Sequence, residues 1–339
     1  MKLFSAAAIL VALAGHAAEA GCQMNKIATL HVSVENNRIL VPGTINQHPV
    51  KFVLATDIES LILATPAHDF DLFRMLAARF QPIIYAEEMS TTGGPVRVAD
   101  LSIDGLKMSE FVMHAVGRRV NFGAVDEVAV IGREFLSKFD VEFDLPAGQV
   151  ILYRPENCEN ANLAYWGERY NVLEMDPHLW VTRVTATVNG HTVKADINSG
   201  NPYTALNLAD APELGISTSA AIKLPPSHDF LADYPMETWQ AMADSVGLDQ
   251  EQIRPAALRV RRLSNPPPIL HPFRDYWDSE TGYAKPQLAF VPGNPNSRHG
   301  AELSIGVDFI RSHRMLIAYS QRKVYFSYVP GQPFLAPVK

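Results

Sequence analysis

The sequence predicts a mainly β protein made of two similar lobes with short helices. Two pairs of matching sequence blocks recur in the same order in the two halves of the chain, as in proteins with repeated structural units. Within the blocks, apolar and polar residues alternate at the spacing of half-buried strands. A length of 339 residues with 47% hydrophobic content also supplies enough apolar material for two cores.

The N-terminal segment is predicted to be a secretory signal peptide. Lys2 supplies a positive start, the apolar run 3–13 is too short to span a membrane stably, and a small-x-small cleavage pattern follows. We therefore expect residues 1–20 to be removed and the mature protein to be periplasmic or secreted. Two alternatives stay open. One is an uncleaved anchor, and the other is a lipoprotein acylated at Cys22, although Glu19 replaces the aliphatic residue that such a signal prefers.

Cys22 and Cys158 are the two cysteines of the chain, one near the start of the mature protein and one after the last predicted strand of the first half. An even number of cysteines in an exported protein favours pairing, so we expect a disulfide between them, with two unpaired thiols as the alternative. Two cysteines cannot form a structural zinc site alone, and the 11 histidines show no metal-ligand spacing. We expect neither a metal nor a cofactor.

The charge pattern limits the kinds of partner. The formal net charge of −7 is spread without long acidic or basic runs, whereas a nucleic-acid partner would need a clustered Lys/Arg face. Beyond the signal peptide, no apolar stretch approaches the length of a membrane span. We therefore expect no nucleic-acid partner, no stable membrane span after signal cleavage, and a monomer.

The first pair of blocks predicts a hairpin that leads into a core strand in each half. Residues 46–57 and 189–200 both begin with a polar turn, continue with His-x-Val-Lys and a short apolar run, and then reach Thr or Ser. Turn residues before an apolar, β-prone run are typical of this structure. Ala55 lies seven residues after its histidine, and Asn198 lies seven residues after the equivalent histidine. These two positions therefore correspond.

The second pair of blocks predicts a short helical turn followed by a β-hairpin. Residues 131–153 and 305–327 each open with Ile-Gly and an apolar helical turn, and then continue with a strand, a tight turn and a second strand. Val141 and Phe143 alternate with polar neighbours, as residues of a half-buried hairpin do.

The repeats predict a division of the chain into lobe one, residues 24–156, and lobe two, residues 168–330. Residues 157–167, rich in Asn and Glu, separate them as a linker. Lobe two contains an insertion at about 208–300 between its blocks. The insertion carries aromatic residues that could cover or fill a groove between the lobes, or else belong to an ordinary ordered loop packed on lobe two: Phe273, Tyr276, Trp277 and Tyr283.

The paired blocks resemble the two signatures of the retropepsin-like aspartic proteases, and the tandem arrangement resembles exported bacterial members and the bilobal pepsin-type enzymes. In that family, an Asn-Gly-x-x-Val turn leads through an apolar strand to Asp-Thr/Ser-Gly. An apolar-Gly motif later begins a short helix, and a hairpin follows. Residues 131–153 match this second signature closely, and residues 99–105 resemble the middle strands. The resemblance implies two acid-protease β-barrel lobes related by pseudo-twofold symmetry.

The resemblance places the catalytic positions of the family at Ala55 and Asn198, so the aspartate is replaced in both halves. The chemistry needs two carboxylates that share one proton, one acting as general base on a water and the other as general acid. Ala55 has no titratable group, and the Asn198 amide cannot accept a proton near neutral pH. The resemblance also implies which residues line the cleft floor and, through the two hydroxyls, join the lobes: Thr56, Asp57, Ser199 and Gly200.

The resemblance therefore implies an inactive aspartic-protease-like protein that binds a peptide or protein partner in the inter-lobe cleft. The alternative is an active endopeptidase with a non-standard dyad, Asp57 and Asp196, each two residues from the family position but in opposite directions. A carboxylate inside an apolar strand is costly unless it is paired, so we expect the Asp196 face of the strand to be solvated. A different hydrolase is disfavoured, because Gly-x-Ser-x-Gly and His-Glu-x-x-His are absent.

Overall fold

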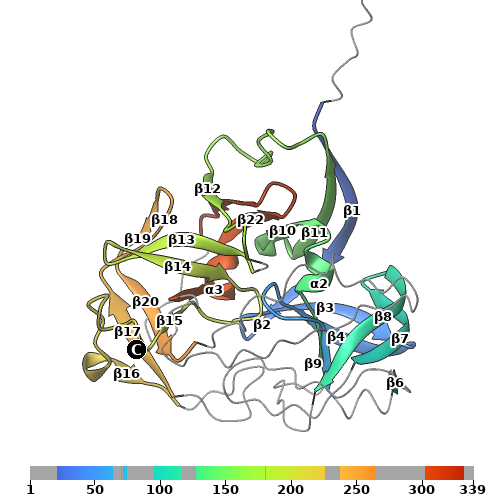
Figure 1. The fold of residues 1–339 in the computed structure, drawn as a ribbon, viewed down its shortest axis with the longest axis horizontal. Helices are drawn as coiled ribbons and strands as arrows, with labels where there is room; N and C mark the ends of the chain where they lie inside the picture. The colour runs from blue at the N-terminus through green and yellow to red at the C-terminus, as the bar shows by residue number, and fades with distance from the viewer. Residues whose placement is uncertain are drawn as a thin grey trace, which may run out of the picture.

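The predicted fold class is confirmed: the protein is mainly β, with two lobes and short helices (Figure 1). The computed structural model describes residues 21–63, 70, 72–74, 95–116, 127–179, 181–225, 237–263 and 302–331. The predicted signal peptide and the four aromatic residues of the predicted insertion lie outside these described residues. Within them, the strands form three sheets, and no helix is long and apolar enough to cross a membrane.

An eight-stranded sheet forms from the first half of the chain, in the order β2-β3-β4-β9-β5-β8-β7-β6. An additional pairing of β3 with β7 closes part of the sheet into a barrel. The β3–β4 hairpin turns at Asn46 and Gln47, which have positive φ values of 46° and 70°, as a two-residue hairpin turn requires. The strands are β2 (Ser33–Glu35), β3 (Arg38–Ile45), β4 (His48–Leu54), β5 (Leu61–Leu63), β6 (Phe73–Arg74), β7 (Pro95–Ile103), β8 (Leu106–Val116) and β9 (Glu127–Ile131).

A nine-stranded sheet repeats this arrangement in the second half, in the order β16-β17-β20-β15-β21-β14-β13-β18-β19. β14 runs parallel to β21 as β4 runs parallel to β9, which is the structural form of the sequence repeat. Part of the predicted insertion, 208–300, supplies β16 to β20. The strands are β13 (Arg183–Val188), β14 (His191–Ile197), β15 (Ala205–Asn207), β16 (Ile222–Lys223), β17 (Thr238–Ala243), β18 (Val246–Leu248), β19 (Glu251–Ile253), β20 (Ala256–Arg261) and β21 (Leu303–Ile305).

A six-stranded sheet, β1-β11-β10-β22-β23-β12, joins the two halves. β10 and β22 pair antiparallel at its centre, and each follows a short helix, α2 or α3. The predicted lobe boundaries stay a prediction, because this sheet takes strands from both sides of residues 157–167. The elements are β1 (Gln23–His31), α2 (Arg133–Leu136), β10 (Asp140–Asp144), β11 (Gln149–Glu156), β12 (Asn171–Glu174), α3 (Val307–Ile310), β22 (His313–Ala318), β23 (Lys323–Tyr328) and the 3₁₀ turns η1 (Leu145–Ala147) and η2 (Thr218–Ala220).

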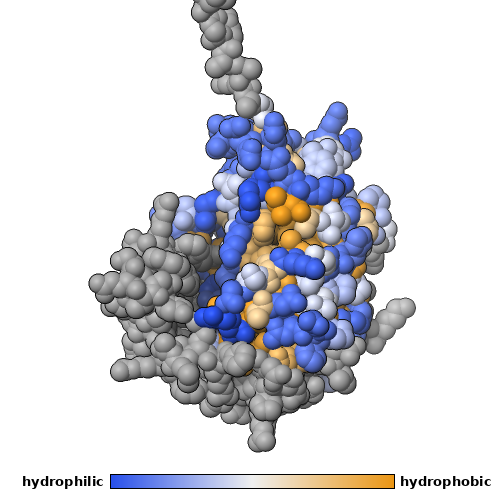
Figure 2. Space-filling view, turned by 90° about the vertical axis from the view of Figure 1, so that its right-hand side faces the viewer, coloured by the Kyte–Doolittle hydropathy of each residue, from blue (hydrophilic) through white to orange (hydrophobic). Residues whose placement is uncertain are grey.

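The main core lies between the sheets, and a smaller one covers the other face of the six-stranded sheet. Phe52, Phe143, Phe309 and Phe326 are fully buried in the main core. On the opposite face, residues of the segment 157–167 pack over β11 and β22 in a second apolar cluster. The segment predicted as a linker therefore packs against the sheet. Some apolar residues also remain at the surface, between hydrophilic ones, on the side of the molecule that carries β1, β7 and β8 (Figure 2).

The predicted disulfide between Cys22 and Cys158 is confirmed. It ties the N-terminal strand β1 to the segment that covers the six-stranded sheet. Cys158 is 4% exposed and belongs to the smaller apolar cluster. The two cysteines are 136 residues apart in the sequence, and their bond lies at the edge of a packed face.

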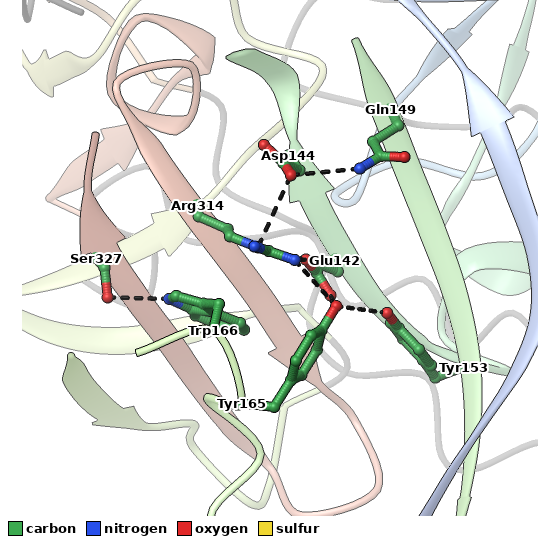
Figure 3. Close-up of polar contacts among 8 residues, drawn as sticks. All are labelled: Glu142, Asp144, Gln149, Tyr153, Tyr165, Trp166, Arg314 and Ser327. Carbon is green, nitrogen blue, oxygen red and sulfur yellow. Dashed lines mark hydrogen bonds and ion pairs between the residues drawn. The ribbon is translucent and has the colours of Figure 1, made fainter. Parts of the chain in front are cut away.

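A polar network crosses from one half to the other on this covered face (Figure 3). Arg314 of β22 forms an ion pair with the fully buried Glu142 of β10, with an N–O distance of 2.6 Å. The Tyr165 hydroxyl donates to the other Glu142 oxygen at 2.8 Å, and the guanidinium lies 5.2 Å from the ring centres of Tyr165 and Trp166. The buried carboxylate therefore receives both a cation and a hydroxyl donor, as a buried charge requires.

Candidate functional site

Two equivalent loops meet where the halves of the protein come together. One follows β4 and the other follows β14. The Ala55 N–H donates to the carbonyl of Ile131 at 3.0 Å, and the Asn198 N–H donates to the carbonyl of Ile305 at 2.8 Å. Each loop is thus fixed by the end of the parallel strand that precedes its short helix. The two positions that correspond in the sequence repeat also correspond in the structure.

Four reciprocal hydrogen bonds join the loops, as predicted for the hydroxyl side chains. The Thr56 hydroxyl donates to the carbonyl of Ile197, and the Ser199 hydroxyl donates to the carbonyl of Leu54, both at 2.9 Å. Each hydroxyl also accepts the backbone N–H of the other loop at 3.1 Å. Thr56 and Ser199 are 1% and 0% exposed. The network therefore fixes the relative position of the loops in a region that excludes water.

The carboxylate of Asp57 and the amide of Asn198 contact each other across the junction. Asn198 Nδ2 donates to Asp57 Oδ2 at 2.8 Å. Gly200 lies against the same groups: a Cβ atom there would be 2.9 Å from the Ala55 Cβ and 3.0 Å from Asp57 Oδ1. Asn198 Oδ1 is buried and has no hydrogen-bond partner among the described residues. The junction therefore presents one carboxylate, one amide and one methyl group, and glycine is required because any side chain would collide with them.

Asp196 is held by an arginine instead of facing solvent, which corrects the expectation of a solvated strand face. Both of its oxygens accept from Arg183, Oδ1 from Nε at 2.7 Å and Oδ2 from Nη2 at 2.8 Å. The side chains are 13% and 6% exposed. Arg183 was missed in the sequence, although the two-residue turn at Asn189 and Gly190 sets a register that places residue 183 opposite residue 196. The cost of burying the carboxylate is offset by this bidentate pair.

In lobe one, a buried acid behind the loop fixes the chain that leads away from it. The Ser60 hydroxyl accepts the N–H of Gly132 at 2.8 Å, and the Ser60 N–H donates to both oxygens of Glu134 at 3.0 Å. Burial raises the pKa of the Glu134 carboxyl.

Lobe two repeats this device with different residues. The Thr204 hydroxyl accepts the N–H of Gly306 at 3.0 Å, and Asp308 Oδ1 accepts the Thr204 N–H at 2.8 Å. Asp308 is fully buried, and burial raises the pKa of its carboxyl to about 6. The sequence signal that could have found both acids is their common place, two residues after the glycine of the second block.

The chemistry available at the junction is hydrogen bonding. A carboxylate next to an amide can accept hydrogen bonds from a ligand, but the amide cannot exchange a proton with it near neutral pH. In the described part of the chain, no group of three or more His, Cys, Asp or Glu residues could hold a metal ion.

No family model matches this chain, and no curated protein matches it. Among solved structures, the chain is similar to the basic 7S globulin from soybean, with 11% identity over 90% of this chain and 95% of that one and a TM-score of 0.43. It is also similar to a retropepsin-like aspartic protease from Rickettsia conorii, with 14% identity over 40% of this chain and 95% of that one and a TM-score of 0.29.

Proposed function

We propose that this protein is an exported, catalytically inactive relative of the aspartic proteases that binds a peptide where its lobes meet. The observation that carries the proposal is the hydrogen bond from Asn198 Nδ2 to Asp57 Oδ2 at 2.8 Å. Proteolysis would need two acids at this place, whereas the hydrogen bond joins one carboxylate and one amide.

The chemistry of peptide hydrolysis explains why this pair is insufficient. An aspartic protease needs one carboxylate to take a proton from water and a second, protonated, to give one to the scissile carbonyl. Asn198 cannot take the second role, and Ala55 cannot take either. Loss of general acid–base catalysis alone is commonly worth about 10²–10⁴-fold in rate.

Binding is favoured over a purely structural role because the hydrogen bonds between the two loops are present although Ala55 and Asn198 stand at the positions of the family's catalytic acids. Thr56 and Ser199 keep all four hydrogen bonds between the loops. Asn198 Oδ1 is buried without a hydrogen-bond partner among the described residues, and an N–H group of a bound extended peptide would supply the missing donor.

The second candidate is an active endopeptidase that uses Asp57 and Asp196. Asp57 favours it, as a carboxylate at the junction. Against it stands the Asp196 carboxylate, because Arg183 holds both of its oxygens. Both oxygens are therefore engaged, and neither is free to bind the water that a dyad would share with Asp57.

A cleavage assay on the purified mature protein separates the two candidates. An unfolded protein substrate is incubated from about pH 3 to about pH 8, the range in which carboxylate pairs change protonation, with wild type, Asp57→Asn and Asp196→Asn. We expect no cleavage above the buffer control from any of them. Cleavage by wild type that disappears in either variant would overturn the proposal in favour of the second candidate.

A further inference from the structure

The face of the nine-stranded sheet that points away from the main core carries a row of side chains that are polar except for Ala205. Leu258 and Val260 of β20 are fully buried in the main core, so Arg259 and Arg261 lie on the opposite face. Residues paired across strands share a face. Following the register from Arg259 gives its same-face neighbours: Gln240, Ala205, Ser304, Asp196 and Arg183.

Two arginines on this face differ in how their charge is balanced. Arg183 has the carboxylate of Asp196 in a bidentate pair. Arg259 donates from Nη1 to Gln240 Oε1 at 2.9 Å, and its guanidinium carbon lies 4.6 Å from the centre of the Tyr203 ring. Both of these partners are uncharged. In the described part of the chain, no carboxylate lies within ion-pair distance of Arg259.

The Arg259 charge is nonetheless partly removed from water. Burial lowers the pKa of its guanidinium. The acid that acts on it through space, Asp308, is itself fully buried, and its Oδ1 accepts from Thr204. A guanidinium has five N–H donors in a planar fork, more than Gln240 and Tyr203 take up. A half-buried cation with unused donors is the arrangement that a carboxylate completes.

Arg259 and its neighbour Arg261 are attached to the junction loop of lobe two. The Arg259 N–H donates to the carbonyl of Thr204 at 3.1 Å. Arg261 Nη2 donates to Asn201 Oδ1 at 3.1 Å, and the Asn201 N–H donates to the carbonyl of Asn198 at 3.3 Å. The cations therefore lie beside the chain that continues directly from Asn198.

We propose that Arg259, positioned by Tyr203 and Gln240, forms a subsite for a carboxylate of the peptide bound at the junction. This inference rests on the proposed function and deepens it by naming an acidic peptide as the ligand class. The carboxylate has two possible sources, an Asp or Glu side chain within the peptide or the free C-terminus. Both present the same two oxygens to the guanidinium fork.

The test compares short fluorescein-labelled peptide libraries that differ at one feature. Two end-blocked libraries are identical except for one central position, Glu in one and Gln in the other. A third has the Gln composition and a free C-terminal carboxylate. Dissociation constants are measured by fluorescence anisotropy at fixed ionic strength, because surface electrostatics depend on salt. We expect wild type to bind one of the two acidic libraries roughly tenfold more tightly than the end-blocked Gln library, and the library that gains identifies the source of the carboxylate.

Variants locate that preference on one residue. Arg259→Gln is expected to bring the ratio of the dissociation constants to about one, and Arg259→Lys to leave it intermediate, because lysine keeps the charge but loses the planar fork. Lys107→Gln, which removes a positive charge from the exposed end of β8, is the control and should keep the wild-type ratio. A partly unfolded fraction weakens binding of all libraries alike, so the ratio remains informative even for a destabilised variant.

The outcomes separate the two levels of the proposal. Equal binding of all three libraries by wild type, or a preference that survives Arg259→Gln, overturns the carboxylate subsite and leaves the peptide-binding function standing. Failure of every library to bind overturns the peptide-binding function itself, and the subsite with it.

Discussion

Replacing Asn198 with aspartate puts a second carboxylate against Asp57 in place of the amide that donates to it. The donor and acceptor atoms are 2.8 Å apart in wild type. A hydrogen bond to a charged group is worth about 1.5–3 kcal/mol. Two carboxylates at this distance cannot both be ionised, so the variant pair has to hold one proton between them.

The shared proton gives the variant a distinctive dependence on pH. The upper pKa of the pair rises above the value of an unfolded aspartate, about 3.9. Between these two values the folded state of Asn198→Asp binds one proton more than the unfolded state. The free energy of unfolding therefore falls as pH rises through that window, by about 1.4 kcal/mol per pH unit. For a window of one to two units, the variant loses about 1.4–3 kcal/mol between about pH 4 and about pH 7, relative to wild type.

Denaturant unfolding at several pH values and constant ionic strength measures this loss. Asn201→Asp is the matched control, since it makes the same chemical change in the same loop. Arg261 donates to that side chain at 3.1 Å. A cation lowers the pKa of a carboxyl group, so the control should not lose stability as pH rises from about 4 to about 7. If Asn198→Asp runs parallel to wild type over this range, Asp57 and Asn198 do not meet as described.

Two further predictions concern buried charges away from the junction. The Asp308 carboxyl has a pKa of about 6 in the folded state against 3.8 ordinarily, so wild type should lose about 3 kcal/mol of unfolding free energy relative to Asp308→Asn as pH rises from about 4 to about 6, as measured by denaturant titrations of both proteins. Parallel profiles would contradict that reasoning. Arg314→Met leaves the Glu142 carboxylate buried without its cation and should cost about 3–5 kcal/mol in the free energy of unfolding. Adding Glu142→Gln should recover most of that loss, whereas the exposed control Lys223→Met should cost no more than about 1 kcal/mol; a double variant as unstable as Arg314→Met would show that the buried charge is not the cause.

The fold class was predictable because its signals are local. The turn at Asn189 and Gly190 fixes the β13–β14 register, and the equivalent turn fixes the β3–β4 register. The six-stranded sheet was not predictable in the same way. β10 and β22 belong to hairpins with the same sequence pattern, and nothing within either hairpin indicates that the two pair with each other.

The candidate site was predictable to the level of its loops. The spacing of the repeat placed Ala55 and Asn198 at equivalent positions, and the hydroxyl residues beside them make the expected hydrogen bonds. The contact between Asp57 and Asn198 was missed, because strand periodicity says nothing about a side chain that projects from the turn after the strand. Arg259 was missed because it lies far along the chain from the loop, and one arginine in a strand gives no sequence signal of an unbalanced charge.

The antiparallel pairing of β10 with β22 has a consequence for the integrity of the molecule. A fragment containing the first half alone would expose the backbone N–H and C=O groups of β10 along an open edge, beside a Glu142 carboxylate deprived of Arg314. An unprotected edge recruits another strand. A second copy of the same fragment offers one in the required antiparallel sense. In the single polypeptide, β10 and β22 stay paired because the two halves are covalently linked. Separate subunits would form this pairing only at a sufficiently high concentration.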